Sequence, residues 1–358
     1  MAVEISAGKL RNLACLADTN GRFKMLAVDQ RGSLQRALAR SLGKDPQAVA
    51  YEELAQTKAT ITRVLAPHAS ALLTDPIFGY PESVRDIPRE VALLLAYEAT
   101  GYDKAGLTGR ERRTRLIDGW SVDKACRAGA NAVKLLLFYH PDASDETRAY
   151  QQDLVRRVGE ECVALDRPFL LELVTYPLAE TGNDTPEFAR HKPDLVQRSA
   201  AEFSKPEYQV DILKLEFPGD LKYTHEYCHK VFDDRERAPQ YTLEQVAGYC
   251  QRLDEAAQLP WVLLSAGVGI REFLLQLELA AEAGASGFLC GRAIWQDAIR
   301  HYPDQAAMER FLAEEGAWNF LRCNAAAERA LPWQLHKRFC GHANMALAGR
   351  SPLWYRDY

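Results

Sequence analysis

The sequence lacks the long apolar runs of membrane and secreted proteins. No stretch reaches the roughly 18 consecutive apolar residues of a membrane-spanning helix, and the first residues lack the apolar core of a signal peptide. The eight cysteines are scattered without a Cys-x-x-Cys pair, which argues against a disulfide framework. We therefore expect a cytoplasmic protein with reduced thiols and no membrane partner.

A positive net charge and nucleotide-binding loops are also missing. The formal net charge is −5, so nucleic acid and anionic membranes are not expected as partners. There is no Walker A loop, and no Gly-x-Gly-x-x-Gly follows the first predicted strand, so nucleotide binding is not indicated. A small anionic substrate is compatible with this charge, because a few local cations can attract it.

What the sequence does contain is an alternation of short apolar runs with longer amphipathic segments. Uninterrupted hydrophobicity within a run is typical of parallel strands that are covered on both faces. Eight runs are predicted as strands: residues 25–29, 71–76, 93–98, 133–139, 169–176, 212–217, 261–268 and 287–292. Helices are predicted between most of them, including 51–65, 271–283 and 121–128 with Ser121 as its N-cap.

Eight strands with interleaved helices predict an α/β fold, a closed (β/α)₈ barrel, in preference to a doubly wound open sheet. The run 93–98 is ambiguous, because its leucine-rich composition also suits a helix. Residues 1–300 are predicted to form the barrel. Residues 301–358 are predicted to form a C-terminal extension, helical over 310–330 and irregular beyond. We expect it to pack on the barrel or on a neighbouring subunit of a homo-oligomer.

A lysine in one apolar run is the first catalytic candidate. Lys214 lies among apolar residues of the run 212–217, and burial disfavours the ammonium form of a lysine, which makes the amine a better nucleophile. The alternative is that Lys214 reaches solvent or pairs with Glu216, its same-face neighbour. Strand C-termini of such a barrel share one mouth. We expect the following polar side chains to converge there: Asp29, Asp75, Glu98, Lys134, Glu172, Lys214, Ser265 and Arg292.

Two acidic positions are candidates for proton transfer and substrate binding. Glu172 lies inside an apolar run, where burial would raise the pKa of a carboxyl towards neutrality and suit it to moving protons. A salt bridge to a lysine is the alternative for Glu172. Asp29 ends the first predicted strand beside Arg31 and Gly32. Gly32 permits a tight turn, and the charged pair could bind a polar substrate.

Glycine-rich turns follow the seventh and eighth predicted strands. The sequence Ser-Ala-Gly-Val-Gly spans 265–269, and Gly-Phe-Leu-Cys-Gly-Arg spans 287–292. Loops at these two positions of (β/α)₈ barrels commonly bind phosphate through backbone N–H groups and a helix N-terminus. Arg292 would add a bidentate donor. An anion site is therefore predicted here.

The segment 225–229 matches a zinc-hydrolase signature, His-Glu-x-x-His. That signature works when both histidines lie on one face of a helix, with the glutamate as a base. Here the segment is polar, follows a Pro-Gly pair at 218–219 and lacks an obvious third ligand. We interpret the match as a coincidence in a solvated loop or helix, and zinc hydrolysis is the minor alternative.

Taken in order, these segments resemble the class I tagatose-bisphosphate aldolase family, including its relatives that cleave sulfofructose phosphate. The matching stretches are AVDQRGSL (27–34), LLLAYEATGYD (93–103), DGWSVDKACRAGANAVKLLLFYHPD (118–142), LLELVTY (170–176), DILKLEFP (211–218), VLLSAGV (262–268) and AGASGFLCGRAIW (283–295). The loop 218–237 and the tail beyond residue 333 depart from the family.

The resemblance implies reversible aldol cleavage of a phosphorylated ketose to dihydroxyacetone phosphate and a three-carbon aldehyde, without a metal or other cofactor. Tagatose bisphosphate, fructose bisphosphate and sulfofructose phosphate are all candidate substrates. A barrel that binds a sugar phosphate as a regulatory sensor, with little turnover, is the alternative function.

The resemblance also implies residue roles. Lys214 would form the Schiff base, and Glu172 would transfer protons. Asp29 and Lys134 would contact substrate hydroxyls. The terminal anions would be held by Arg31, Ser265, Gly267, Gly291 and Arg292, and Gln30 and Glu216 are further substrate-binding candidates.

Overall fold

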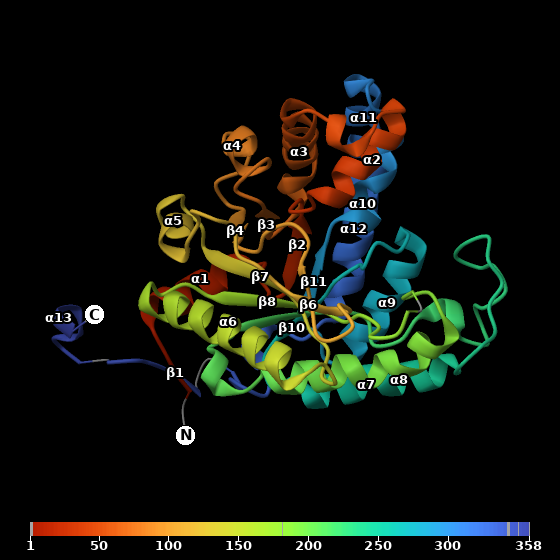
Figure 1. The fold of residues 1–358 in the computed structure, drawn as a ribbon. Coiled ribbons are helices and arrows are strands. Elements are labelled where there is room, and N and C mark those ends of the chain that lie inside the picture. The colour runs from red at the N-terminus through yellow and green to blue at the C-terminus, as the bar shows by residue number, and fades with distance from the viewer. Residues whose placement is uncertain (1–2, 181, 342–343, 350, 358) are drawn as a thin grey trace.

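The computed structural model describes residues 3–180, 182–341, 344–349 and 351–357. At its centre, eight parallel strands form a closed barrel surrounded by helices (Figure 1). The strands follow one another around the barrel in sequence order, and the last barrel strand pairs with the first. The predicted (β/α)₈ barrel is confirmed.

Each of the eight apolar runs overlaps a barrel strand. These strands are β2 (Phe23–Ala27), β3 (Ala71–Thr74), β4 (Ala92–Ala96), β7 (Ala132–Phe138), β8 (Phe169–Val174), β9 (Ile212–Leu215), β10 (Trp261–Leu263) and β11 (Gly287–Cys290). The ambiguous run is strand β4, which pairs with β3 and β7 and is buried along its whole length. Several predicted runs extend past the strand end, because the buried chain continues into the turns at the mouth.

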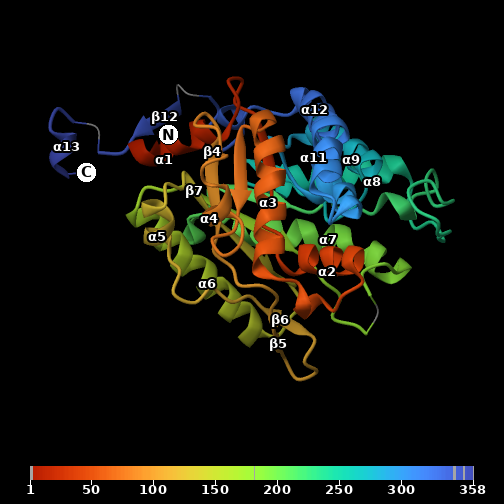
Figure 2. The same ribbon diagram turned by 90° about the horizontal axis from the view of Figure 1, so that it is seen from above.

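Helices cover the outside of the barrel, as Figures 1 and 2 show from two directions. They are α1 (Ala7–Leu16), α2 (Gly32–Leu42), α3 (Tyr51–Leu65), α4 (Tyr80–Ser83), α5 (Val122–Arg127), α6 (Asp145–Ala164), α7 (Pro186–Phe203), α8 (Leu243–Ala256), α9 (Ile270–Ala283), α10 (Arg292–Trp295), α11 (Gln305–Phe311) and α12 (Ala317–Ala326). The three predicted helices correspond to α3, α9 and α5. Ser121 caps α5 by accepting a hydrogen bond from the Lys124 N–H. No helix in the described ranges is long and apolar enough to cross a membrane.

The chain beyond the barrel first covers its side and then its N-terminal end. A π-helical turn joins α11 to α12, and the buried side chains Met308, Leu312 and Phe320 belong to the same apolar core as the barrel helices. Strand β12 (Met345–Leu347) then pairs in parallel with β1 (Val3–Ile5). The last helix, α13 (Trp354–Asp357), lies apart from the barrel in both views (Figures 1 and 2).

A two-stranded hairpin, not predicted from the sequence, enlarges the loop after β4. Strands β5 (Asp103–Ala105) and β6 (Glu111–Arg113) pair in antiparallel fashion. Figure 2 shows the hairpin at the periphery of the molecule, and Leu107 at its tip is fully exposed. The hairpin places β6 side chains close to the strand ends of the barrel.

A buried ion pair fixes the N-terminal ends of two neighbouring strands. Lys9 Nζ lies 2.8 Å from Asp211 Oδ2, and the same carboxylate oxygen accepts a hydrogen bond of 2.9 Å from the Phe169 N–H. Asp211 directly precedes β9, and Phe169 begins β8. The pair therefore ties together the starts of the strands that carry Lys214 and Glu172.

Gly287 should be the glycine on which barrel closure depends. Its φ is +139°, and a Cβ there would lie 1.9 Å from the carbonyl oxygen of Phe23 on β2. We expect Gly287→Ala to lower the free energy of unfolding by on the order of 3 kcal/mol or more, because backbone rather than a flexible side chain must move. Chemical denaturation measures this loss.

Gly43→Ala is the matched control. Gly43 also has a positive φ, of +62°, but no atom lies within 4 Å of the position that an alanine methyl group would take there, so the expected cost is about 1 kcal/mol. Equal losses in the two variants would contradict the importance of the close approach between β11 and β2.

Candidate active site

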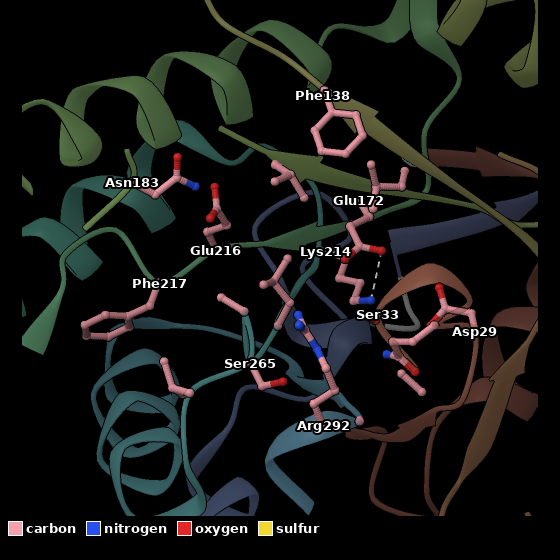
Figure 3. Close-up of a pocket in the computed structure, with 18 of the residues that line it drawn as sticks. Asp29, Ser33, Phe138, Glu172, Asn183, Lys214, Glu216, Phe217, Ser265 and Arg292 are labelled. Atoms are coloured by element: carbon pink, nitrogen blue, oxygen red, sulfur yellow. Dashed lines mark ion pairs between the residues drawn. The ribbon is translucent and has the colours of Figure 1, made fainter. Parts of the chain in front are cut away.

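A cavity of about 770 Å³ opens at the C-terminal ends of the barrel strands. Side chains from strands β7, β8 and β9 and from the loops after β2, β4, β8, β9, β10 and β11 line it, and Figure 3 shows how they face one another. Nine of the predicted site residues are in its lining: Asp29, Gln30, Arg31, Glu172, Lys214, Glu216, Ser265, Gly291 and Arg292. The expected convergence of strand-end side chains is observed for these residues.

Lys214 and Glu172 face each other at the bottom of this cavity (Figure 3). They are paired in register across β8 and β9, so their side chains project from the same face of the barrel wall. Lys214 Nζ lies 2.9 Å from Glu172 Oε2, and both side chains are more than 90% buried. A buried amine thus stands beside a carboxylate that can exchange a proton with it.

Below them, Lys134 holds three carboxylates. Its Nζ lies 2.8 Å from Asp29 Oδ2, 2.8 Å from Glu98 Oε1 and 2.8 Å from Glu172 Oε2. Lys134 is fully buried and is not among the side chains that line the cavity. The three carboxylates that it binds do line the cavity, so Lys134 affects the cavity through them. Glu172 is therefore shared between Lys134 below and Lys214 beside it.

These contacts determine the charge state of the carboxylates. Burial alone would raise the pKa of Glu172, but the ammonium groups of Lys134 and Lys214 lower the pKa below its usual value. The prediction of a near-neutral Glu172 is therefore wrong. Burial also opposes the ionised form of Asp29, and the same two lysines still bring its pKa well below the usual value. Against the effect of burial, the surrounding carboxylates raise the pKa of Lys134 well above normal.

Arg31 and Gln30 follow Asp29 and present unused polar atoms. Arg31 Nη2 donates a hydrogen bond of 2.6 Å to the carbonyl oxygen of Glu98. The buried atoms Arg31 Nη1 and Gln30 Oε1 have no hydrogen-bond partner among the described residues. Buried polar groups are normally paired, so these atoms indicate contacts that a ligand would complete.

The two glycine-rich turns lie beside one another under Arg292. Gly267 has a φ of +87°, and a Cβ there would lie 2.9 Å from Arg292 Nη1, so the guanidinium lies directly across this turn. A Cβ on Gly291 would lie 2.3 Å from the carbonyl oxygen of Ala27. Gly267 thus permits Arg292 to approach the turn after β10, and Gly291 permits the end of β11 to approach β2. Ser265 and Arg292 face the cavity (Figure 3).

Glu216 lies on the opposite side of Lys214 from Asp29 (Figure 3). Its Oε2 accepts hydrogen bonds of 2.7 Å from both the N–H and the hydroxyl of Thr175, while Oε1 lies 3.9 Å from Lys192 Nζ. The suggested pairing of Lys214 with Glu216 is not observed, because Glu172 pairs with Lys214 instead. Glu216 ties the ends of β8 and β9 together and keeps one oxygen at the cavity.

Two sequence-predicted groups lie outside this constellation. Asp75 is fully buried against Lys58 of α3, at 2.7 Å, and does not line the cavity, so its expected place at the mouth is wrong. His225 lies in a turn and His229 in an isolated β-bridge with Glu236, and both are exposed. Glu226 accepts a hydrogen bond from the Leu243 N–H. The helix that the zinc signature needs is therefore not formed by these residues.

Sequence comparisons give a consistent family assignment. The profile of the family described as "DeoC/LacD family aldolase" matches residues 23–297. The tagatose 1,6-diphosphate aldolase of Streptococcus pneumoniae (strain TIGR4) is 36% identical over 324 residues, which cover 89% of this chain and 95% of the relative. The tagatose 1,6-diphosphate aldolase of Lactococcus lactis is 36% identical over 91% of this chain and 97% of its own length.

This chain belongs to the DeoC/LacD aldolase family. Solved structures agree on the fold of this family member. A fructose-bisphosphate aldolase from Plasmodium falciparum superposes with a TM-score of 0.64 at 15% identity, covering 92% of this chain and 98% of the other. An archaeal fructose 1,6-bisphosphate aldolase gives a TM-score of 0.52 at 18% identity, covering 87% and 99%.

Several residues that this DeoC/LacD family member brings to the cavity are not predicted from the sequence. Glu98 is expected at a strand end, but not as a binding partner of Lys134 and Arg31. Arg36, Lys192, Lys222 and Glu272 lie on helices or loops that surround the mouth. Their spacing in the sequence carries no signal, because only the closed barrel brings them together.

Glu272 gives this cavity a pH-dependent contribution to stability. It is 3% exposed on α9, and burial raises its pKa from 4.5 to about 7. The folded state therefore keeps a proton that the unfolded chain loses near pH 4.5. Between about pH 4.5 and pH 7 the unfolded state binds fewer protons than the folded state. The free energy of unfolding therefore falls with rising pH over this range, by up to about 1.4 kcal/mol per pH unit, and stays lower above pH 7.

We expect Glu272→Gln to remove this dependence. The free energy of unfolding of the variant minus that of the natural chain should increase from about pH 5 to about pH 8. Denaturant titrations across this range measure the difference. Glu278→Gln, an exposed position on the same helix, should show no such increase. A difference that is constant with pH at position 272 would refute the raised pKa.

Proposed function

We propose that this DeoC/LacD family member is a class I aldolase that cleaves a phosphorylated ketose through a Schiff base on Lys214. The observation that carries the proposal is the buried pair of Lys214 and Glu172, 2.9 Å apart at the bottom of the cavity. A buried lysine next to a proton acceptor is the arrangement that imine formation with a carbonyl requires. Ketose bisphosphates are the substrate class named for the relatives.

The first stage joins the ketose to the enzyme. Lys214 passes a proton to Glu172, and the neutral amine attacks the ketose carbonyl carbon to form a carbinolamine. Its hydroxyl leaves as water, with a proton returned by Glu172, and a cationic iminium remains on Lys214. The ion pair in the structure is the resting state of this proton exchange, and the lowered pKa of Glu172 provides the carboxylate that accepts the proton.

The second stage breaks the bond between C3 and C4. Glu172 removes the proton of the C4 hydroxyl, the C4 oxygen becomes an aldehyde, and the bonding electrons pass into the iminium to give an enamine. The three-carbon aldehyde leaves. Protonation of the enamine at C3 and addition of water then release dihydroxyacetone phosphate and free Lys214. This route needs no metal, because the iminium itself accepts the electrons.

The other side chains are proposed to position the substrate. Asp29 would bind its hydroxyls, whereas Lys134 would act from below by keeping Asp29 and Glu172 charged and in place. Ser265, Gly267, Gly291 and Arg292 would bind the phosphate next to the carbonyl end. Arg31 Nη1 would bind an anionic oxygen at the other end. Gln30 and Glu216 would complete the polar wall of the cavity.

Three further assignments are part of the proposal. The substrate is a tagatose, fructose or sulfofructose phosphate. The barrel domain spans residues 1–300, and residues 301–358 extend it. The enzyme acts in the cytoplasm as a homo-oligomer.

Replacement of Lys214 should abolish turnover. Without its amine no iminium can form, so Lys214→Ala should release no dihydroxyacetone phosphate from a ketose bisphosphate. In the natural chain, borohydride with dihydroxyacetone phosphate should leave a stable adduct on Lys214, detected by peptide mass spectrometry. His225→Ala, which alters an exposed histidine outside the cavity, should retain activity. An absent adduct or an active Lys214 variant would sink the proposal.

Replacement of Glu172 should slow the reaction without preventing imine formation. Glu172→Gln removes the proton acceptor, so kcat should fall by about 10²- to 10⁴-fold, while slow borohydride trapping on Lys214 continues. Glu187→Gln, an exposed position at the start of α7, serves as the control and should be fully active. Steady-state kinetics compare the variants, and a Glu172→Gln enzyme with normal kcat would remove Glu172 from the mechanism.

A further inference from the structure

A fully buried lysine on one of the covering helices contacts the strand end that leads to Asp29. Lys58, on α3, has no exposed surface. Its Nζ donates hydrogen bonds to the carbonyl oxygen of Val28 and to Asp75 Oδ2, the latter at 2.7 Å. Lysine is almost never fully buried unless it is paired, because its ammonium group loses its water. A lysine at this position therefore needs a reason beyond the filling of space.

Attachment of α3 to the barrel is not that reason. Leu54, Ile61 and Leu65 of the same helix are buried in the apolar core that the barrel shares. Apolar side chains alone can hold a helix on a sheet, and replacement of a buried ion pair by apolar residues of similar volume is often neutral or stabilising. A methionine at position 58 would suffice for packing. The polar contacts of Lys58 thus indicate what this residue does.

These contacts are made where β2 ends. Ala27 is the last residue of β2, Val28 follows it, and Asp29 comes next. The carbonyl oxygen of Ala27 accepts a hydrogen bond of 3.0 Å from Trp295 Nε1. The next carbonyl oxygen, that of Val28, accepts the bond from Lys58. Side chains from α10 and α3 thus fix two successive peptide groups directly before Asp29.

The amine of Lys58 is itself fixed by Asp75. Oδ1 of this carboxylate accepts hydrogen bonds of 3.0 Å from the Ile77 N–H and 2.9 Å from the Phe78 N–H, while Oδ2 accepts the bond from Lys58. The carboxylate is fully buried, and both of its oxygens are used. The turn after β3, Asp75 and Lys58 therefore form one continuous set of bonds that ends at the Val28 carbonyl group.

Asp29 needs accurate placement because it lines the cavity. Its Oδ2 lies 2.8 Å from Lys134 Nζ, so its side chain is held from inside the barrel, whereas Lys58 holds the preceding peptide group from outside. Against the effect of burial, Lys134 and Lys214 lower the pKa of Asp29, and a third lysine, Lys58, contributes to that lowering. Misplacement of a contacting group by about 1 Å can cost on the order of 10²-fold in rate.

We propose that Lys58 is a positioning residue: by binding the carbonyl oxygen of Val28, it sets the place of Asp29 against the hydroxyls of the substrate. The inference rests on the proposed function and adds to it a residue that does not touch the substrate, since Lys58 is not among the side chains that line the cavity. Asp75 acts with Lys58 as its counter-ion and so serves the site from outside it.

Kinetics of a single substitution test the inference first. Lys58→Met keeps a similar side-chain volume and removes the donor, so kcat/KM for a ketose bisphosphate should fall by about tenfold or more. Ile61→Ala is the control, because it removes buried atoms from the same helix and leaves the Val28 carbonyl oxygen bound. It should lower the free energy of unfolding in denaturant titrations and keep kcat/KM within about twofold of the natural value.

A double-mutant cycle shows whether Lys58 acts through Asp29. Titration calorimetry gives the dissociation constant of a hexitol 1,6-bisphosphate, which lacks the carbonyl and cannot form an imine with Lys214. Lys58→Met should weaken its binding by about threefold or more in the natural chain and by less than about 1.5-fold in Asp29→Ala, because residues that act together are not additive. A residue with a merely structural role would weaken binding equally in both proteins.

Three results would overturn the inference: normal kcat/KM in Lys58→Met, an equal loss of kcat/KM in Ile61→Ala, or the same weakening of binding with and without Asp29. If Lys58→Met does not fold, Lys58→Met/Asp75→Asn removes the carboxylate left unpaired and should give the same kinetic and binding changes. The binding outcomes do not depend on turnover. Absence of a borohydride adduct on Lys214 would instead refute the aldolase proposal and leave the cycle valid.

Discussion

The site depends on one buried ammonium group. Lys134 contacts carboxylates from three different strands or strand ends, at 2.8 Å each, above an apolar layer of the barrel interior. Burying an isolated charge would cost many kcal/mol, so neither the lysine nor its carboxylates could occupy these positions alone. Together they hold Asp29, Glu98 and Glu172 in fixed positions beneath the cavity, and Glu172 in turn meets Lys214.

The barrel interior is accordingly divided into two layers. Towards the N-terminal ends, side chains such as Met25, Leu94 and Leu170 fill it with apolar atoms. Towards the C-terminal ends, charged groups replace them. The apolar layer gives the polar layer a rigid base, and the ion pair of Lys9 with Asp211 fixes the N-terminal ends of the two strands that carry Lys214 and Glu172. Preorganised charges of this kind need little rearrangement during a reaction.

The strands and the central pair could be predicted from the sequence, because their signals are local. A strand buried on both faces appears as an apolar run, and a lysine or glutamate inside it is conspicuous. The charge of Glu172 could not be predicted, since it depends on Lys134 and Lys214 from two other strands. Asp75 resembles Asp29 in its sequence setting, but a lysine from α3 binds it. The β5–β6 hairpin could not be predicted because its strands are short and polar.

The linked charges beneath the cavity differ from the residues around its mouth, and this has a consequence for how the enzyme can change. The linked charges depend on one another, so a substitution there disturbs several contacts at once. Arg36 and Lys222 line the cavity from α2 and from the loop after β9, outside that network. Residues around the mouth can therefore change among descendants of this protein one at a time, while the linked charges beneath the cavity are inherited together.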